Sequence, residues 1–316
     1  MMKDKPSILA LALLLWAVLL PGCGYSQMTV VSDIEESFSG IKQVELYGGP
    51  LEVSYEGKEG ASDVSLSAYL ETNRENGVKI SYEVKGDKLI VKWDQSKKTN
   101  SWRNFRHEGY ISVTGPKEIQ LEVSSGSGKA FVSNIESEEL KVSAGSGHVV
   151  VNDLEVNQVY LAVGSGHIEA MDIEGNIDCK VSSGHAELED IEGNINAVAS
   201  SGQLSIEDVD GEVSAVVSSG RIVMEDITEV ASLTSSSGSI SGNDVGLSST
   251  TNLKCSSGSI KINTTSNLDD FNFDMVASSG SLRVGDQKKG KILKIDNNSG
   301  MTVKGVTSSG SLSIQH

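Results

Sequence analysis

From Gly128 onward, a Ser-Gly dipeptide returns at a nearly constant interval. The steps between successive glycines are 19, 19, 18, 18, 18, 18, 20, 22 and 20 residues, and the final step is 10. A fixed period of this size is typical of a solenoid, in which each repeat forms one coil that stacks on the previous coil. The repeated glycines are Gly128, Gly147, Gly166, Gly184, Gly202, Gly220, Gly238, Gly258, Gly280, Gly300 and Gly310.

Between these glycines, apolar and polar residues alternate, which predicts β-strands. After Gly202, for example, one polar residue separates Leu204 from Ile206, and a second alternating run leads into the next Ser-Gly pair. Alternate side chains of a strand share one face, so the apolar residues should line one interior. Gly175, Gly193 and Gly211, each nine residues after a repeat glycine, indicate a second corner. We therefore expect an all-β fold, a parallel β-helix with coils of about 18 residues.

Residues 39–120 contain further alternating segments, such as 51–55 and 89–93, without the regular repeat. The end coil of a solenoid is an open sheet edge that needs cover. The sequence therefore predicts four parts: a signal peptide (1–22), a tether (23–38), an irregular N-terminal β cap or degenerate coils (39–120), and the Ser-Gly repeat β-helix (121–316).

The N-terminal segment predicts export. Lys3 and Lys5 precede an uncharged apolar run over 8–20, which is followed by Leu20-Pro21-Gly22-Cys23. A run of this length is typical of a secretory signal, since a transmembrane helix needs about 20 residues. The ending resembles a bacterial lipobox, although Pro21 departs from the usual small residue. The resemblance implies lipidation of Cys23 and anchoring to the outer face of the cell membrane. The alternative is a plain signal peptide with an incidental cysteine.

The net charge and the cysteines limit the possible partners and cross-links. The formal net charge is −17, which disfavours binding to nucleic acid. Cys179 and Cys255 stand where other coils have Ala, Leu or Val, and they are separated by four coils. We therefore expect small core residues and not a disulfide.

The chain also resembles a known family. The Thr114-Gly115-Pro116-Lys117 turn, the segment Leu-Glu-Val-Ser-Ser-Gly-Ser-Gly at 121–128 and the repeated Ser-Ser-Gly units carry this resemblance. Over residues 40–316 they resemble the bacterial β-strand-repeat family called "putative adhesin", whose function is unknown. The resemblance implies an exported, right-handed β-helix with no assigned chemistry.

Three residue types recur at fixed positions of the repeat. Serine precedes every repeat glycine, and so many equivalent serines indicate corners and not one nucleophile. His148, His167 and His185 follow three consecutive repeat glycines and predict an exposed stack, for which we expect no metal, because a linear column does not converge three imidazoles on one ion. Acidic residues recur six positions after the glycine, where we expect turn caps; a cation ladder is the alternative. They are Asp153, Asp172, Asp190, Asp208, Asp226, Asp244 and Asp286, with Asn134 in the first coil.

One segment carries a positive charge, opposite to the net charge of the chain. Residues 97–107 are basic and aromatic, within a protein that is acidic and poor in aromatic residues. Such a segment is suited to an anionic polymer or to lipid headgroups. The alternative is a hairpin loop whose aromatic side chains fold back over the cap. The candidate binding residues are Lys97, Lys98, Trp102, Arg103, Phe105 and Arg106.

These observations predict a non-enzymatic, lipid-anchored surface protein, an adhesin or scaffold without a cofactor, which contacts the membrane through its lipid and binds an envelope polymer or an envelope protein. The sequence leaves the oligomeric state open. One alternative is an accessory of an envelope-stress signalling system. A second, a polysaccharide-active β-helix enzyme, is disfavoured because the repeats contain no Trp for sugar subsites.

Overall fold

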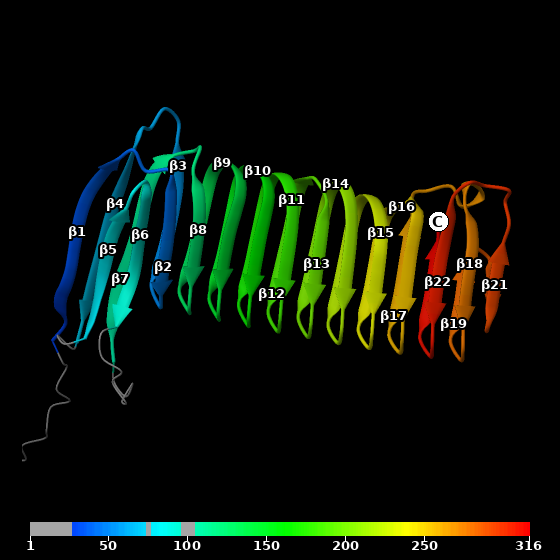
Figure 1. Ribbon diagram of the computed structural model, residues 1–316. Coiled ribbons are helices and arrows are strands. Elements are labelled where there is room, and N and C mark those ends of the chain that lie inside the picture. The colour runs from blue at the N-terminus through cyan, green and yellow to red at the C-terminus, as the bar shows by residue number, and fades with distance from the viewer. Residues whose placement is uncertain (1–26, 74–76, 96–104) are drawn as a thin grey trace, which may run out of the picture.

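The computed structural model describes residues 27–73, 77–95 and 105–316. Within these residues the protein is all-β: strands β1 to β23 stack into a rod, and the sole helical element is the short 3-10 turn η1 (Leu268–Asp270) (Figure 1). The predicted all-β solenoid is therefore confirmed. In the described part of the chain, none of the helical structure is long and apolar enough to span a bilayer.

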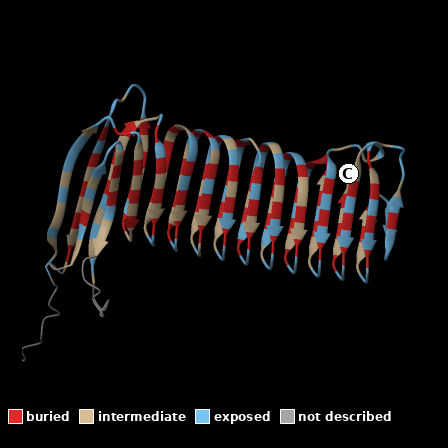
Figure 2. Ribbon diagram, in the orientation of Figure 1, coloured by how far each residue is buried: buried red, intermediate tan, exposed pale blue. Residues whose placement is uncertain are grey.

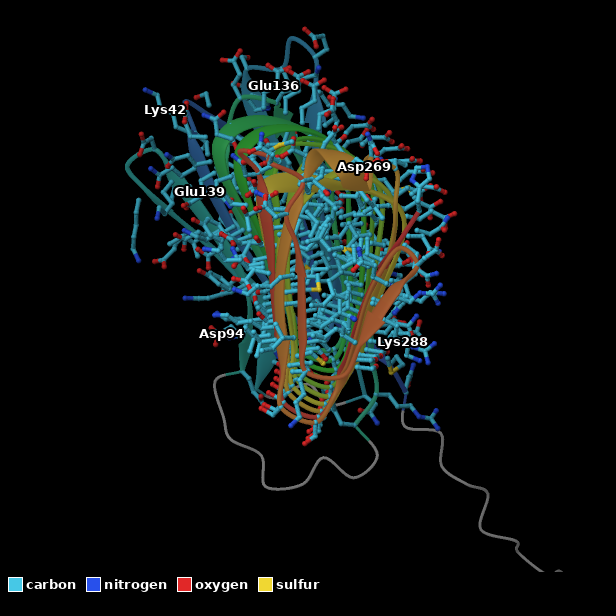
Figure 3. The ribbon with its side chains drawn as sticks, turned by 90° about the vertical axis from the view of Figure 1, so that its right-hand side faces the viewer. Lys42, Asp94, Glu136, Glu139, Asp269 and Lys288 are labelled. Carbon is cyan, nitrogen blue, oxygen red and sulfur yellow. The ribbon has the colours of Figure 1, made fainter. Side chains whose placement is uncertain are left out.

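Each central coil is built from one long strand, or from two shorter ones, and neighbouring coils pair in parallel. His148 lies beside His167, which lies beside His185, which in turn lies beside Gln203. Seen from the end of the rod, each coil has two arms that meet in a rounded arch (Figure 3). The strands are β9 (Lys129–Ala144), β10 (His148–Val163), β11 (His167–Val181), β12 (His185–Glu192), β13 (Ile195–Ala199), β14 (Gln203–Val217), β15 (Arg221–Ser235) and β16 (Ser239–Cys255).

The apolar side chains face the space between the two arms. Ile168 and Ala170 of one arm are buried, as are Ile177 and Val181 of the other. The same positions are buried in each coil, so the buried residues form bands along the rod (Figure 2). Cys179 and Cys255 belong to this core and are unpaired, as expected.

The Ser-Gly corners are glycine because the coils approach each other too closely for a side chain. A Cβ on Gly166 would lie 1.8 Å from the carbonyl oxygen of Gly147, and one on Gly220 would lie 1.9 Å from that of Gly202. The backbone ladder continues through these corners, where the Ser183 amide donates to the Gly164 carbonyl at 2.8 Å. Glycine is therefore required because it lets the coils approach closely enough to form hydrogen bonds, and not because the backbone has a positive φ there.

The N-terminal end combines opening coils with an antiparallel cap. β2 (Gln43–Gly49) and β3 (Glu52–Lys58) pair in parallel with β8 (Gln120–Ser125) and β9, while β6 (Lys88–Gln95) and β7 (His107–Pro116) extend them outward. The outermost strands reverse direction: β5 (Val78–Lys85) pairs with β6, and β4 (Asp63–Thr72) pairs with β7. The open edge of the rod is thereby covered.

Part of the predicted tether is structured. Residues Thr29–Ser39, most of which we had assigned to the tether over 23–38, form β1, which pairs antiparallel with β4. Val31, Ile34 and Phe38 pack against the core. A register shift between Val30 and Ser32 breaks the strict alternation that would have revealed this strand in the sequence.

The C-terminal coil does not follow the chain order. β22 (Thr302–Thr307) and β23 (Ser311–Gln315) insert between β16 and β17 (Ser259–Thr264) on one side and β18 (Asn272–Ala277) and β19 (Ser281–Val284) on the other (Figure 1). β20 (Gln287–Lys289) and β21 (Ile292–Ile295) then close the end as antiparallel strands.

This insertion changes the roles of two residues of the repeat. Gly310 contacts both Gly258 and Gly280, whereas a Cβ on Gly300 would meet nothing within 4 Å, so Gly300 is not a corner. Asp286 likewise lies in the β19–β20 hairpin, where Gly285 and not the aspartate has a positive φ. The anomalous step of 10 residues reflects this return of the chain.

The two kinds of Ser-Gly glycine can be compared directly. We expect Gly220→Ala to destabilise the fold by about 1–3 kcal/mol, because the methyl group would overlap the Gly202 carbonyl oxygen of the preceding coil. Gly300→Ala, the matched control, has room for the methyl group and should unfold like the wild type. Thermal and urea unfolding of both variants measure the difference, and equal midpoints would contradict the role of the corner.

Candidate functional site

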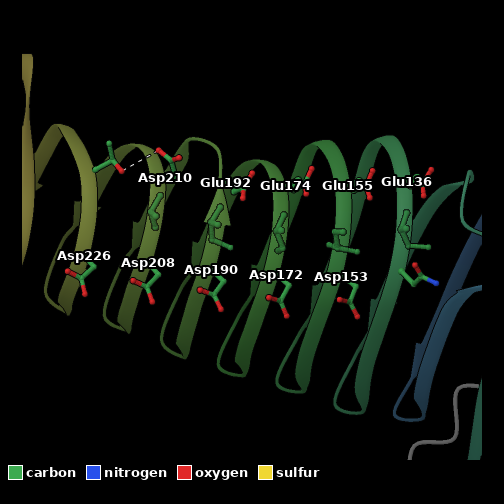
Figure 4. A pocket seen from close by; sticks show the side chains of 17 residues that line it. Glu136, Asp153, Glu155, Asp172, Glu174, Asp190, Glu192, Asp208, Asp210 and Asp226 are labelled. Atoms are coloured by element: carbon green, nitrogen blue, oxygen red, sulfur yellow. Dashed lines mark hydrogen bonds between the residues drawn. The ribbon is translucent and has the colours of Figure 1, made fainter.

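An acidic groove runs along the shoulder of the arch, where the coils place carboxylates side by side (Figure 4). It has a volume of about 680 Å³ and lies between two columns of acidic residues. The first column is the predicted one, from Asn134 to Asp226. The second lies two residues further along each coil, separated from the first by a buried aliphatic residue, and consists of Glu136, Glu155, Glu174, Glu192 and Asp210.

The first column exists because the backbone turns there. From Asn134 to Asp244, the seven members have φ between 50° and 59°, the left-handed region. Asn and Asp enter this region at less cost than other residues with a side chain. In the residues that the structure describes, no backbone N–H donates to an aspartate of this column. Instead, Asp153 and Asp244 accept from the side chains of Asn152 and Asn243, at 3.2 and 2.7 Å. The aspartates therefore do serve the turn, but through their backbone conformation and not through the capping hydrogen bonds that we had expected.

Stacking of coils also stacks like charges. Neighbouring coils are about 4.8 Å apart, so each carboxylate lies beside the equivalent carboxylate of the adjacent coil. Desolvation, followed by the charges of Glu189 and Glu225 and then of the adjacent aspartates, raises the pKa of Glu207. The repeats therefore concentrate negative potential on this side of the rod, which favours cationic or cation-bridged ligands over bare anions.

The histidines form the predicted column on one arm, next to the Ser-Gly corner. The ring centroids of His148 and His167 are 4.9 Å apart, and those of His167 and His185 are 5.0 Å apart. The side chains are about one third exposed, between 30% and 37%. Glu169 and Glu187 lie on the same face, two residues after His167 and His185, and our sequence analysis missed both of them. The signal was available, because residues i and i+2 of a strand share a face.

The basic patch is only partly described. Cys23, Lys97, Lys98, Trp102 and Arg103 lie outside the described residues. Phe105 packs on the cap, with its ring 5.4 Å from that of His107 and 6.5 Å from that of Trp93. Burial lowers the pKa of His107 in this cluster. Arg106 is exposed, and its backbone N–H donates to the Asn73 side chain at 2.9 Å.

The turn role of the aspartate column can be tested at Asp190. Asp190→Ala should lower the free energy of unfolding by about 1 kcal/mol, because alanine pays more for the left-handed region. Asp190→Asn removes the same charge but keeps this backbone preference, so it should be neutral or stabilising in thermal unfolding. A large calcium-dependent rise in melting temperature, reversed by a chelator and lost in both variants, would instead show a cation ladder.

Comparison with known proteins places this architecture. A "putative lipid binding protein" from Parabacteroides distasonis ATCC 8503 has a similar structure, with a TM-score of 0.50 and 16% identity over 93% of this chain and 98% of that one. A "putative adhesin" from the same organism (TM-score 0.47, 16% identity, 92% and 98% coverage) and one from Parabacteroides merdae ATCC 43184 (TM-score 0.42, 14% identity, 93% and 98% coverage) also match.

No curated protein matches the chain. The Toastrack DUF4097 family model matches residues 50–315, from β3 of the opening coils through the Ser-Gly repeats to the inserted C-terminal coil. The family resemblance seen in the sequence is thereby confirmed, and the chain belongs to the Toastrack DUF4097 family.

Proposed function

We propose that the protein is a non-enzymatic, lipid-anchored scaffold or adhesin of the cell surface, which binds an anionic polymer of the envelope. The observation that carries this proposal is the repetition of the same side chains on successive coils. Such columns form a regular, largely acidic surface along the rod and support the non-enzymatic part of the proposal. They do not assemble the nucleophile, base and oxyanion site that acyl or glycosyl transfer requires at one place.

The arrangement of the cap supports an anchor at one end of the rod. β1 begins at Thr29, six residues after Cys23. A chain spans at most about 3.6 Å per residue, so a lipid on Cys23 would hold the start of β1 within roughly 20 Å of the membrane surface. The N-terminal cap would then stand near the bilayer, and the repeats would extend from it.

The strand that follows the basic segment, β7, starts at the same edge of the cap as β1. Thr29 pairs with Thr72, and Thr72 pairs with His107, so the start of β1 lies two strands from the start of β7. Positive charge at this edge suits anionic polymer or anionic headgroups near the membrane, whereas the acidic repeats repel both. The proposed polymer site therefore belongs to the cap and not to the acidic groove.

The anchor is tested by Cys23→Ala. Without the thiol no thioether can form, so the variant should appear in the soluble fraction or stay uncleaved, while the wild type sediments with membranes. Mass spectrometry of the mature N-terminus should show a diacylglycerol adduct on Cys23. Cleavage at another residue, without lipid, would contradict the proposal.

The polymer site is tested by reversing charge in the basic segment. Arg103→Glu with Arg106→Glu should reduce binding to teichoic-type polymer at least tenfold, and wild-type binding should weaken steeply with added salt. Lys288→Glu with Lys289→Glu, exposed at the opposite end of the rod, is the matched control and should bind normally. Lowered melting temperature in the first variant would show that the segment is a structural part of the cap.

A further inference from the structure

We propose that His148, His167 and Glu169 form a binding site for a divalent transition-metal ion of the zinc type. The three side chains lie on β10 and β11, beside the Ser-Gly corner and away from the acidic groove. Their ligand atoms, two imidazole nitrogens and one carboxylate oxygen, all lie within 4.8 Å of one another. Imidazole and carboxylate are the ligands of zinc sites that keep a fourth position open.

The distances fit such an ion. The Nε2 atoms of His148 and His167 lie 3.1 and 3.2 Å from the same Glu169 Oε1. Ligand atoms at the corners of a tetrahedron with bonds of about 2.0–2.1 Å are roughly 3.3 Å apart. Both His–Glu pairs are therefore already close to the spacing that a bound ion needs, and the ligands come from two adjacent coils.

The orientation of His148 singles out this pair of coils. Its ring is turned 73° from that of His167, whereas His167 and His185 are stacked at 21°. Although His148 Nε2 is close to the Glu169 carboxylate, it is excluded from solvent and makes no hydrogen bond. A buried polar atom without a partner is uncommon. A metal ion would occupy its lone pair.

The third histidine has a separate partner. His185 Nε2 lies 2.9 Å from Glu187 Oε1 and forms a hydrogen bond with it. We had expected no metal because three stacked imidazoles cannot converge on one ion. The proposed site does not need them to, because a carboxylate replaces the third imidazole. On the other side of the histidines the column continues with Lys129, and beyond His185 it continues with Gln203, so the ligand set is confined to these coils.

The experiment is a Zn²⁺ titration of the full mature protein, purified in detergent and first treated with a chelator. Excess Ca²⁺ is present to occupy sites made of carboxylates alone. We expect calorimetry to show one equivalent of Zn²⁺ bound, and thermal unfolding to show a higher melting temperature, because the ion binds only the folded arrangement. A chelator should reverse both effects.

Three variants and one matched control assign the ligands. His148→Ser, His167→Ser and Glu169→Gln should each weaken Zn²⁺ binding at least tenfold. The melting temperature without metal should be unchanged, because serine already occupies the histidine column at Ser239 and glutamine has nearly the shape of glutamate. His185→Gln should bind Zn²⁺ like the wild type. The proposal fails if no Zn²⁺ binds, if the three variants still bind it, or if His185→Gln weakens binding equally. If His167→Ser does not fold, Glu169→Gln decides the proposal, because glutamine has nearly the same shape as glutamate.

Discussion

The backbone ladder between coils at the Ser-Gly corners controls the rest of the structure. At these corners the chain must turn while each coil remains within hydrogen-bonding distance of the next, and the carbonyl oxygen of one glycine occupies the place where a side chain of the next would be. Glycine is therefore required in every coil. Once the corners are fixed in register, each position of a coil lies directly above the same position of its neighbour, and the two arms enclose one continuous apolar core.

Exact stacking has an electrostatic consequence. A residue that suits the turn in one coil suits it in all, so the left-handed position repeats Asp along the arch, and carboxylates accumulate at the spacing of the strands. Beside this column, desolvation and then the neighbouring carboxylates raise the pKa of Glu207. On the opposite edge of the coil, the same stacking brings two histidines and a glutamate together, with the Nε2 atoms of His148 and His167 at 3.1 and 3.2 Å from one carboxylate oxygen of Glu169. Register thus determines the chemistry of both surfaces.

The periodic part of the fold could be predicted from the sequence, because period, alternation and corner glycines each repeat many times. Burial of Cys179 follows from its position in the repeat, and this burial raises the pKa of its thiol to about 12. The structural features that occur only once in the chain could not be predicted. The shift near Val30 conceals β1, and nothing local to residues 302–315 indicates that they insert between earlier coils. Glu169 was predictable in principle, since it shares a strand face with His167. It belongs to a different column of the repeat, however, and recurs in fewer coils than the histidine does.

The inserted C-terminal coil makes the two ends of the rod unequal. The coil of β18 and β19 rests on β22 and β23, which follow it in the chain, so its neighbours are complete only after residues 302–315 have been made. The earlier coils can stack in the order in which they are made, whereas the far end must wait for β22 and β23. A gain or loss of repeats in evolution is therefore easiest between Gly147 and Gly238, where each coil pairs only with the coils before and after it in the chain, so the length of the rod can change while both of its ends stay the same.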